Sequence, residues 1–375
     1  MITALAFSTI EAIDRCAWNN CFPEELEDWD YYRAIEQAGI VGFQWRYLAL
    51  YENDVLMAAA VAFTTAYSLD SSIQGLGKHI STRLRRWWPS LFEVRIYALG
   101  SPVAEQCHVA TARHVGSAQR PVLLAQLLVL ARNDADQADI GLLAVKDASH
   151  RDPQWLQACR EAGLQSLPGL PNAELPITFG SVEAYLGSLG KSTRKDLRRT
   201  LRERGPRVEW RRSVQDLLPR MMQLYEATLA RSELACDHLP AAYLRQVVEH
   251  LDARAACVLY WQGEELVAFN LVLLDKHRLV DKFFAHDPTV TREHNLYVRK
   301  WLANVDYCIE HRIAIYECGT SADASKLHLG CSFIGNTLFF RHRNRLFNYG
   351  LRLVKMLIRA DRSAPAMVAA ISETR

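Results

Sequence analysis

The order of elements predicted for the first half of the chain returns in the second half, and this recurrence constrains the fold more than any other feature. Apolar alternation and turn residues predict a β-hairpin over residues 45–67, then a strand, a helix, a strand, a short helix and a final strand near residue 178. A hairpin opens the same order again at residue 257, and a strand pair closes it near residue 343. Because the halves share no sequence identity, the shared order itself indicates a duplicated fold.

We therefore expect an α/β (α+β) protein of two tandem units, each with a mixed, mainly antiparallel central sheet flanked by helices. At 375 residues, 50% of them apolar, the chain is long enough for two cores. Turn-forming prolines and glycines are frequent just before residue 174, and they indicate a domain boundary near residue 178. The predicted division is 1–178, 179–345 and a basic terminal helix with a loose tail over 346–375.

Cysteine usage and hydropathy indicate the compartment. The nine cysteines form no C-x-x-C pair, which indicates a reduced compartment. No apolar run could span a membrane, and acidic residues interrupt the N-terminus too early for a signal peptide. We expect a cytoplasmic protein whose basic tail either packs as a helix or makes a peripheral contact with an anionic membrane surface. We expect no metal, because one window of possible ligands lacks the paired short spacings of zinc sites: Cys308, His311, Cys318, His328 and Cys331.

Positive charge is concentrated in one segment. Residues 191–212 hold ten Lys and Arg against three Asp and Glu, a local net charge of +7 in a chain whose total is +2. On a helix these basic residues line up over a narrow apolar seam of Leu197 and Leu201. The segment is either a solvated helix face or a binding site for an anionic partner. Like charges at i, i+4 repel and destabilise the helix, so their concentration here favours the binding site.

Two places in the second half resemble the FemAB-like acyltransferases of the GNAT superfamily. One is Tyr185-Leu-x-x-Leu-x-Lys191-x-x-Arg194-x-x-Leu197-Arg198-Arg199, which is similar to that family's helix of the form L-x-K-x-x-R-x-x-L/I-R/K. The other is Ile315-Tyr316-Glu317-Cys318-Gly319 followed by Ser325-Lys326-x-x-x-Gly330, which is similar to the family's strand ending in glycine and its F-K-x-x-x-G segment. The resemblance covers about residues 180–340, and the first half is assigned mainly by the order of its elements.

Departures from the family's pattern concern the acyl donor. Acyl-CoA-binding GNAT enzymes usually carry Q/R-x-x-G-x-G/A between the third strand and the next helix, where backbone N–H groups cradle the pyrophosphate. The corresponding connection here, residues 286–295, has no glycine, and a similar string, Gln74-Gly-Leu-Gly77-Lys78, lies in the first half. Ser325 stands where the family has phenylalanine. The donor is therefore either an acyl thioester, on CoA or an acyl carrier protein, or an aminoacyl-tRNA.

The resemblance places the reacting carbonyl where the third and fourth strands of a unit separate. There Lys326 would stabilise the developing oxyanion, an acid or histidine would accept the proton of the amine, and a tyrosine would protonate the leaving thiolate. Each residue also has a structural interpretation, such as an ion pair between Asp281 and Lys282. The candidate catalytic residues are Lys326, Glu317, Asp281, His286, Tyr316 and Tyr297.

Other candidates would hold the donor or the substrate. Two of the substrate candidates are tryptophans in the irregular segment 70–92, and for them packing beneath a long connection is the alternative. The donor-binding candidates are Lys191, Arg194, Lys195, Arg198, Arg199, Arg292 and Asn295. The substrate-binding candidates are Arg46, Arg86, Trp87 and Trp88.

We therefore expect an N-acyltransferase that moves an acyl group from acyl-CoA, or another acyl thioester used as co-substrate, to an amine-bearing acceptor by direct attack in a ternary complex. The first alternative is an aminoacyl-tRNA-dependent transferase. The second is a non-catalytic module that binds nucleic acid or an anionic envelope precursor. The sequence shows no Ser-His-Asp constellation and no G-x-S-x-G elbow, which disfavours hydrolase chemistry.

Overall fold

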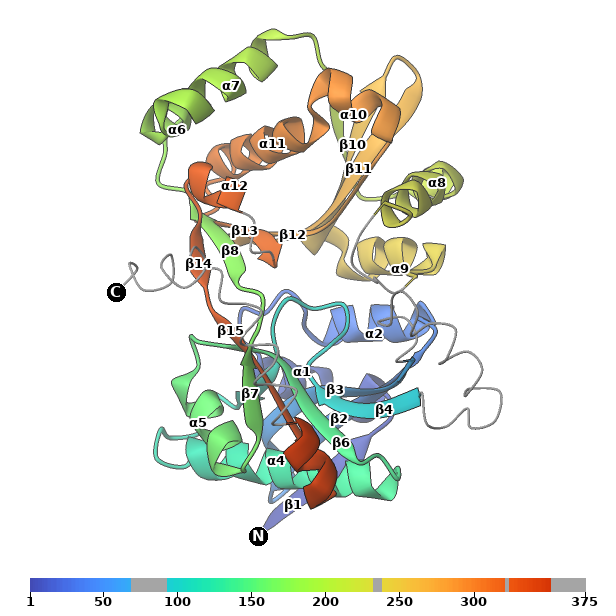
Figure 1. The fold of residues 1–375 in the computed structure, drawn as a ribbon, viewed down its shortest axis with the longest axis vertical. Coiled ribbons are helices and arrows are strands. Elements are labelled where there is room, and N and C mark those ends of the chain that lie inside the picture. Colours follow the sequence, from blue (N-terminus) through green and yellow to red (C-terminus); the bar gives the residue numbers. More distant parts are fainter. Residues whose placement is uncertain (69–92, 232–237, 321–323, 352–375) are drawn as a thin grey trace. The chain divides into compact units, whose positions relative to one another are not determined.

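The structure is a computed structural model that describes residues 1–68, 93–231, 238–320 and 324–351. The chain forms two compact units (Figure 1). Unit 1 consists of Met1–Glu25, Val41–Leu170 and Gly335–Arg375, and unit 2 consists of Leu26–Ile40 and Pro171–Ile334. This division differs from the predicted single boundary near residue 178, because one segment from each end of the chain belongs to the other half's unit.

Unit 1 is built on an eight-stranded sheet in the order β1-β2-β3-β4-β6-β15-β7, with β5 beside β3. All neighbours are antiparallel except β4 and β6, which are parallel. The strands are β1 (Ile2–Phe7), β2 (Phe43–Glu52), β3 (Val55–Ser68), β4 (Glu93–Leu99), β5 (Val109–Thr111), β6 (Leu142–Ser149), β7 (Gln165–Pro168) and β15 (Asn336–His342). The helices are η1 (Ile10–Ala12), α1 (Arg15–Cys21), α4 (Arg120–Gln137) and α5 (Pro153–Glu161).

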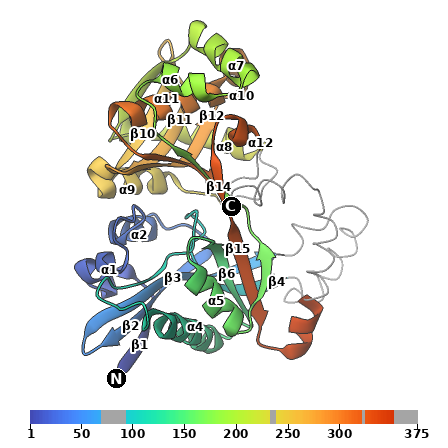
Figure 2. The same ribbon diagram turned by 90° about the vertical axis from the view of Figure 1, so that its left-hand side faces the viewer.

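The predicted first hairpin is confirmed as β2 and β3. Glu52 pairs with Val55, and the two turn residues Asn53 and Asp54 have φ of 49° and 63°. Asn and Asp tolerate this left-handed conformation, which a two-residue turn between twisted strands requires. The long helix α4 packs on this sheet with α5 beside it (Figure 2). Its buried leucines are Leu123, Leu124, Leu127 and Leu128.

Unit 2 is built on a seven-stranded sheet in the order β14-β8-β13-β12-β11-β10-β9. Only β12 and β13 are parallel neighbours. The strands are β8 (Asn172–Pro176), β9 (Arg207–Arg211), β10 (Ala255–Gln262), β11 (Glu265–Leu274), β12 (Arg278–His286), β13 (Ile315–Thr320) and β14 (Ser332–Ile334). The helices are α2 (Trp29–Gln37), α6 (Val182–Ser188), α7 (Lys191–Arg202), η4 (Gln215–Leu217), α8 (Leu218–Leu229), α9 (Ala241–Leu251), η5 (Asp252–Arg254), α10 (Pro288–His294), α11 (Leu296–Glu310) and α12 (Ala324–His328).

Helices cover both faces of the unit 2 sheet, as Figure 1 shows. Side chains alternate between the faces along β11: Asn270 lies beneath α11, whereas Phe269 packs with Phe283 on the side of α8. Helices α6 and α7 pack on α11, and α2 packs on α9 on the opposite side. The predicted hairpin of β10 and β11 is confirmed, with Gly263 in its turn at φ of 60°. The predicted fold class, two tandem mixed sheets flanked by helices, is confirmed.

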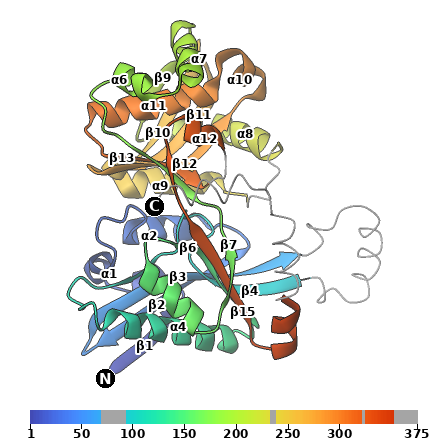
Figure 3. The same ribbon diagram turned by 60° about the vertical axis from the view of Figure 1, so that its left-hand side comes forward.

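Each half of the chain contributes one segment to the unit formed mainly by the other half: Leu26–Ile40 belongs to unit 2, and Gly335–Arg375 belongs to unit 1. Asp28 caps the N-terminus of α2 and receives a hydrogen bond from Arg254 at 2.7 Å, both within unit 2. Strand β15 enters the unit 1 sheet between β6 and β7 (Figure 3). The predicted pairing of β14 with β15 is therefore wrong, because Gly335 separates two strands that enter different sheets.

The described part of the chain contains no helix that is both long and apolar enough to cross a membrane. Of the basic tail, residues 345–351 are helical, and residues 352–375 lie outside the described residues. Leu346 and Phe347 are 82% and 66% exposed, so this first part of the tail does not bury its apolar side chains within the chain. The membrane contact of the tail stays a prediction.

Candidate functional site

The candidate site of unit 2 lies where its two parallel strands separate. Strands β12 and β13 pair only from Arg278 opposite Ile315 to Val280 opposite Glu317. Beyond that point β12 continues to His286 and β13 continues to Thr320 without pairing with each other. A bulge at Lys282 shifts the register of β12 against β11, which increases the local twist. The separation brings Asp281, Tyr316 and Lys326 into one neighbourhood, as the sequence predicts.

A buried polar network links the two strands at this point. Asp281 forms an ion pair with Lys300 of α11 and accepts hydrogen bonds from Tyr316 at 2.8 Å and from Asn270 at 2.6 Å. Asn304 donates to both Tyr316 and Asn270 at 3.0 Å. Every member is at most 6% exposed. Because a buried charge must be paired and hydrogen-bonded, the network fixes α11 to the sheet.

The network settles the ionisation of its members. Burial raises the pKa of Asp281, but the attraction of Lys300 and the hydrogen bonds outweigh burial, so that the pKa lies below its ordinary value. Burial and the Asp281 charge hold the pKa of Tyr316 well above its usual range. Tyr316 thus keeps its proton, and its hydroxyl donates a hydrogen bond to Asp281. The predicted pairing of Asp281 with Lys282 is not formed, since Lys282 pairs with Glu27 instead.

Lys300, Asn270 and Asn304 were not predicted as site residues, although the sequence carries a signal for each. Asn270 is a lone polar residue within the apolar strand LVAFNLVLL. Lys300 and Asn304 are spaced i, i+4 on α11 and therefore share one face of that helix. A polar side chain in the middle of a buried strand requires a hydrogen-bond partner. Asn270 therefore predicts a polar partner on a neighbouring element, and Asn304 is that partner.

Lys326 is the most buried cation of the predicted set. It lies on α12, is 6% exposed, and donates to the main-chain carbonyls of Cys318 at 2.6 Å and Gly319 at 3.2 Å. Burial lowers its pKa, since an ammonium loses hydration there. Gly319 has φ of 78°, which favours glycine and turns the chain at the end of β13. Lys326 is therefore not a surface residue.

Three further catalytic candidates lie on the same two strands and on α11. Glu317 forms an ion pair with Arg278 at 3.2 Å, on the neighbouring strand. Burial lowers the pKa of His286, so its imidazole is neutral near pH 7. The ring of Tyr297 lies 4.9 Å from the Lys300 ammonium, within cation–π range.

The donor-binding candidates lie mainly on α7. Leu197 and Thr200 form the buried seam of this helix, whereas Leu201, predicted in that seam, is 48% exposed. Arg198 pairs with Glu183, and Arg199 lies within 4.0 Å of Asp196 and Glu203. Arg194 donates to the carbonyl of Gly187, and Asn295 donates to Thr200 at 3.4 Å. Lys191 and Lys195 are exposed, and the side chain of Arg292 lies outside the described residues.

The substrate-binding candidates belong to unit 1. The guanidinium of Arg46 forms an ion pair with Asp134 of α4, donating from Nε at 2.7 Å, and Tyr97 donates to the same carboxylate at 2.8 Å. The structure thus places Arg46 in a bridge between β2 and α4. Arg86, Trp87 and Trp88 lie outside the described residues.

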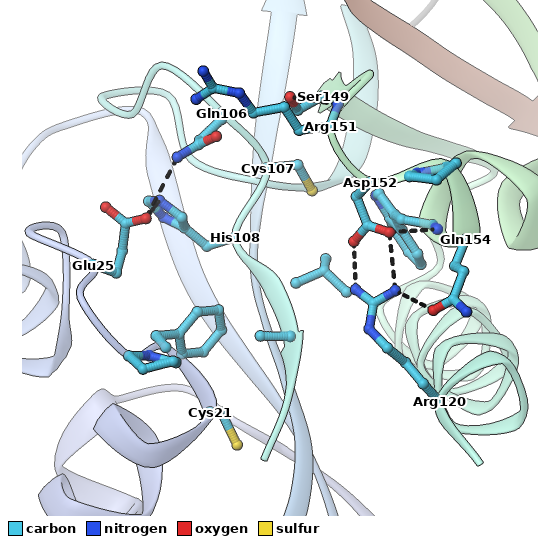
Figure 4. A pocket seen from close by; sticks show the side chains of 16 residues that line it. Cys21, Glu25, Gln106, Cys107, His108, Arg120, Ser149, Arg151, Asp152 and Gln154 are labelled. Carbon is cyan, nitrogen blue, oxygen red and sulfur yellow. Dashed lines mark hydrogen bonds and ion pairs between the residues drawn. The ribbon is translucent and has the colours of Figure 1, made fainter. Parts of the chain in front are cut away.

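Unit 1 contains a cavity of about 550 Å³, shown in Figure 4. It lies among β5, the end of β6 and the first residues of α4 and α5. Arg120 spans one side, donating to Asp152 at 2.9 Å and to Gln154 at 2.7 Å. On the other side Gln106 donates to Glu25, whose carboxylate lies 3.8 Å from His108. The lining residues are Cys21, Phe22, Pro23, Glu25, Gln106, Cys107, His108, Val109, Ala110, Arg120, Ser149, Arg151, Asp152, Pro153, Gln154 and Trp155.

Unit 1 contains a second string that fits the glycine pattern of the GNAT phosphate-binding loop. The string at Gln74 lies outside the described residues, but Arg113-His-Val-Gly116-Ser-Ala118 fits R-x-x-G-x-A and directly precedes α4. This connection follows β5 in unit 1, as the pattern requires. The string lies in the connection before the predicted helix and was not identified from the sequence.

Comparison with known proteins agrees with this fold. Residues 191–327 match a family model described as an acetyltransferase (GNAT) domain. Two curated proteins of Mycobacterium tuberculosis, strains CDC 1551 and H37Rv, are both named "Putative 8-amino-7-oxononanoate synthase 2" and are 24% identical over 335 residues. The match covers 84% of this chain but only 42% of each relative, so the chain spans less than half of their length.

Two solved structures share the fold over most of the chain. FemX is similar with a TM-score of 0.56 and 12% identity, covering 90% of this chain and 96% of FemX. A tandem GNAT protein from the clavulanic acid biosynthesis pathway is similar with a TM-score of 0.52 and 9% identity, covering 92% of this chain and 99% of that one. These likenesses extend over both units.

Proposed function

We propose that this chain, a FemAB-like GNAT acyltransferase, moves an acyl group from an acyl thioester to an amine acceptor by direct attack in a ternary complex. The observation that carries the proposal is Lys326. Its buried ammonium lies against the carbonyls of Cys318 and Gly319, at the end of β13 where the parallel neighbour β12 has departed. A preorganised cation in a water-poor place stabilises the charge that develops on a carbonyl oxygen.

In the proposed reaction the neutral amine attacks the thioester carbonyl. The C–N bond forms, the C–S bond breaks, and Lys326 stabilises the oxyanion between these events. His286, neutral near pH 7, or Glu317 accepts the proton that leaves the amine, and the departing thiolate takes up that proton to become the thiol. Asp281 and Tyr316 act as positioning residues in this scheme, because their proton and charge are engaged in the buried network.

The exposed cations of α7 are proposed to contact the phosphates of the donor. Lys191 and Lys195 are exposed on this helix, so their charge is available to an anion. The acyl group and the acceptor are to be identified by assay.

The experiment is a thiol-release assay of the full chain with acyl-CoAs of increasing length and a panel of amines. Lys326→Ala is expected to abolish turnover while the unfolding transition is retained. His328→Ala is the matched control, since His328 is exposed on the same short helix α12. Near-normal turnover by Lys326→Ala would refute the proposal.

A transferase that takes its acyl group from aminoacyl-tRNA is the second candidate. It is favoured by the basic residues spread along the whole of α7, more charge than a few phosphates require. Donor binding that weakens steeply with salt would identify a nucleic acid, because many counterions are released. If neither acetyl-CoA nor tRNA raises the melting temperature, the third possibility is favoured, a non-catalytic module that binds nucleic acid or an anionic envelope precursor.

A further inference from the structure

We propose that Cys318 and Cys331 of unit 2 are an oxidisable pair, and that the disulfide between them displaces Lys326 and suppresses acyl transfer. The disulfide depends only on the two thiols and their surroundings. Its effect on turnover rests on the proposed function, which gives Lys326 its part in the reaction. In a reduced compartment such disulfides are transient and arise under oxidation.

The two thiols touch inside unit 2. Cys318 belongs to β13 and Cys331 directly precedes β14, and these strands flank β8. The sulfur atoms are 3.7 Å apart, and each residue is 6% exposed. A sulfenic acid on one cysteine condenses with a neighbouring thiol, so neither cysteine needs a partner from elsewhere in the chain to form a disulfide.

Lys326 is hydrogen-bonded to both members of the pair. Its ammonium donates to the carbonyl of Cys318 at 2.6 Å. Its own carbonyl accepts a hydrogen bond from the main-chain N–H of Cys331 at 3.0 Å. The side chain and the main chain of this lysine are thus each held by one of the two cysteines, so a displacement of either cysteine reaches Lys326 directly.

The approach of the two sulfurs should move Cys331 more than Cys318. A disulfide bond is about 2 Å long, so the sulfurs must come closer than their present contact. Cys318 lies within β13, which pairs with β8 both before and after this residue. Cys331 lies outside the strands, after a turn at Gly330 with φ of 88°. The movement is therefore expected at the end of α12, where the N–H of Cys331 holds Lys326.

Hydrogen peroxide is an oxidant small enough to reach a buried pair. Burial holds the pKa of Cys318 well above its usual range, so this thiol keeps its proton. The first attack is therefore assigned to Cys331, whose thiolate breaks the O–O bond of peroxide and becomes a sulfenic acid. The released hydroxide takes up the proton that the Cys331 thiol has lost.

The second step joins the two sulfurs. The sulfur of Cys318 attacks the sulfur of Cys331, the S–S bond forms and the S–O bond breaks. The departing hydroxide takes the proton of the Cys318 thiol. The two thiols lose two electrons in total, and one peroxide is reduced to two waters.

The test is peptide mapping of the full chain after treatment with increasing hydrogen peroxide, with free thiols blocked during denaturation. Trypsin cleaves after Lys326 and after the flanking arginines, so Cys318 is released on residues 313–326 and Cys331 on residues 327–341. Only a disulfide keeps these two peptides together. The linked peptide is expected after peroxide treatment and should disappear on reduction with dithiothreitol.

The exposed Cys16 of unit 1 reports whether the oxidant has acted. A linked peptide that forms over the same range of peroxide concentration supports the inference. Absence of the linked peptide at concentrations that oxidise Cys16 would overturn it.

Two alanine variants test the order of attack. In Cys318→Ala the sulfenic acid has no thiol to condense with, so the peptide 327–341 should gain two oxygen atoms as a sulfinic acid. In Cys331→Ala the peptide 313–326 should stay unmodified. Neither peptide contains methionine or tryptophan, so added oxygen is assigned to the cysteine. The opposite pattern would overturn the assigned order.

Cys257→Ala is the matched control, because it removes a buried thiol from β10 of the same unit. This variant should form the linked peptide as the wild-type protein does. Loss of the linked peptide in Cys257→Ala as well would assign the effect of the other two variants to altered packing and would overturn the pair.

Turnover should fall in proportion to the linked fraction, by about tenfold or more at full oxidation, and should return with dithiothreitol. Linked protein with normal turnover would overturn the effect on Lys326. Reduced protein that turns over no thioester with any amine, yet forms the linked peptide, would refute the proposed function and sustain the pair. Turnover that depends on Lys326, without a linked peptide after oxidation, would do the reverse.

Discussion

Asp281 and Lys300 form a buried ion pair that ties α11 to β12 at the point where β12 leaves β13. Asp281→Asn is expected to cost about 3–5 kcal/mol in the free energy of unfolding, because it leaves the Lys300 ammonium buried without a counter-charge. The double variant Asp281→Asn/Lys300→Met should recover most of this loss. Urea unfolding of the single and double variants measures the coupling.

The exposed pair of Arg343 and Asp139 is the control for that cycle. Asp139→Asn should leave the unfolding midpoint unchanged, since exposed pairs contribute little. Equal losses from Asp281→Asn and from the double variant would contradict the assigned role of Lys300.

The rate of acyl transfer should decline at alkaline pH earlier than an ordinary lysine would allow. Burial lowers the pKa of Lys326 below 10.5, and the proposed oxyanion contact requires the charged form. Activity should therefore be present below the lowered pKa and be lost as pH rises through it. If Lys326→Arg retains turnover, its alkaline limb should move to higher pH, because arginine stays charged. The pH profile of kcat measures both, and an unmoved limb would assign the titration to another group.

The same lowered pKa has the opposite consequence for stability. Between the folded and the unfolded pKa of Lys326 the unfolded chain binds more protons, so the free energy of unfolding should rise with pH over that window. Lys326→Met should lose this pH dependence. Unfolding midpoints measured across the alkaline range provide the comparison, with wild-type protein as the reference.

Arg46→Ala is expected to act on stability. Asp134 is buried, and without Arg46 it keeps only the hydrogen bond from Tyr97 among its described partners on these strands. We expect a loss of about 1–3 kcal/mol in the free energy of unfolding, the cost of a buried polar group with lost partners. KM for the acceptor should be unchanged. A raised KM with normal stability would instead support the predicted substrate contact of Arg46.

Charge reversal on α7 should weaken the donor without weakening the fold. Lys191→Glu and Lys195→Glu change exposed side chains, so the unfolding midpoint should be nearly constant. KM for the donor should rise, and its salt dependence should flatten, since fewer counterions are released on binding. Lys276→Glu, a change of an exposed lysine between β11 and β12, is the control. Normal donor kinetics in both lysine variants would assign α7 to a plain solvated face.

Local structure was largely predictable from the sequence. The turn at Asn53 and Asp54 and the turn at Gly263 follow from residues that tolerate a positive φ, and both hairpins formed where expected. The position of Lys326 near the parallel strands came from a resemblance in short motifs. Its burial against two carbonyls did not, because solvent exposure depends on the packing of α12 on the rest of unit 2.

Long-range pairing was not predictable in the same way. Strand β15 reads as a hairpin partner of β14, yet it pairs with β6, nearly two hundred residues earlier. Hydrophobic alternation determines which face of a strand is buried but not which strand lies beside it. The string Arg113–Ala118, by contrast, fits its pattern in the sequence alone and was not identified there.

The place of β15 between β6 and β7 also bears on synthesis at the ribosome. The unit 1 sheet lacks an interior strand until residue 342 has emerged, although most of that sheet is translated within the first 170 residues. During the interval β6 and β7 present unpaired edges, which are prone to adventitious association. The nascent chain therefore exposes these strand edges for a long period, and a chain truncated before β15 would expose them permanently.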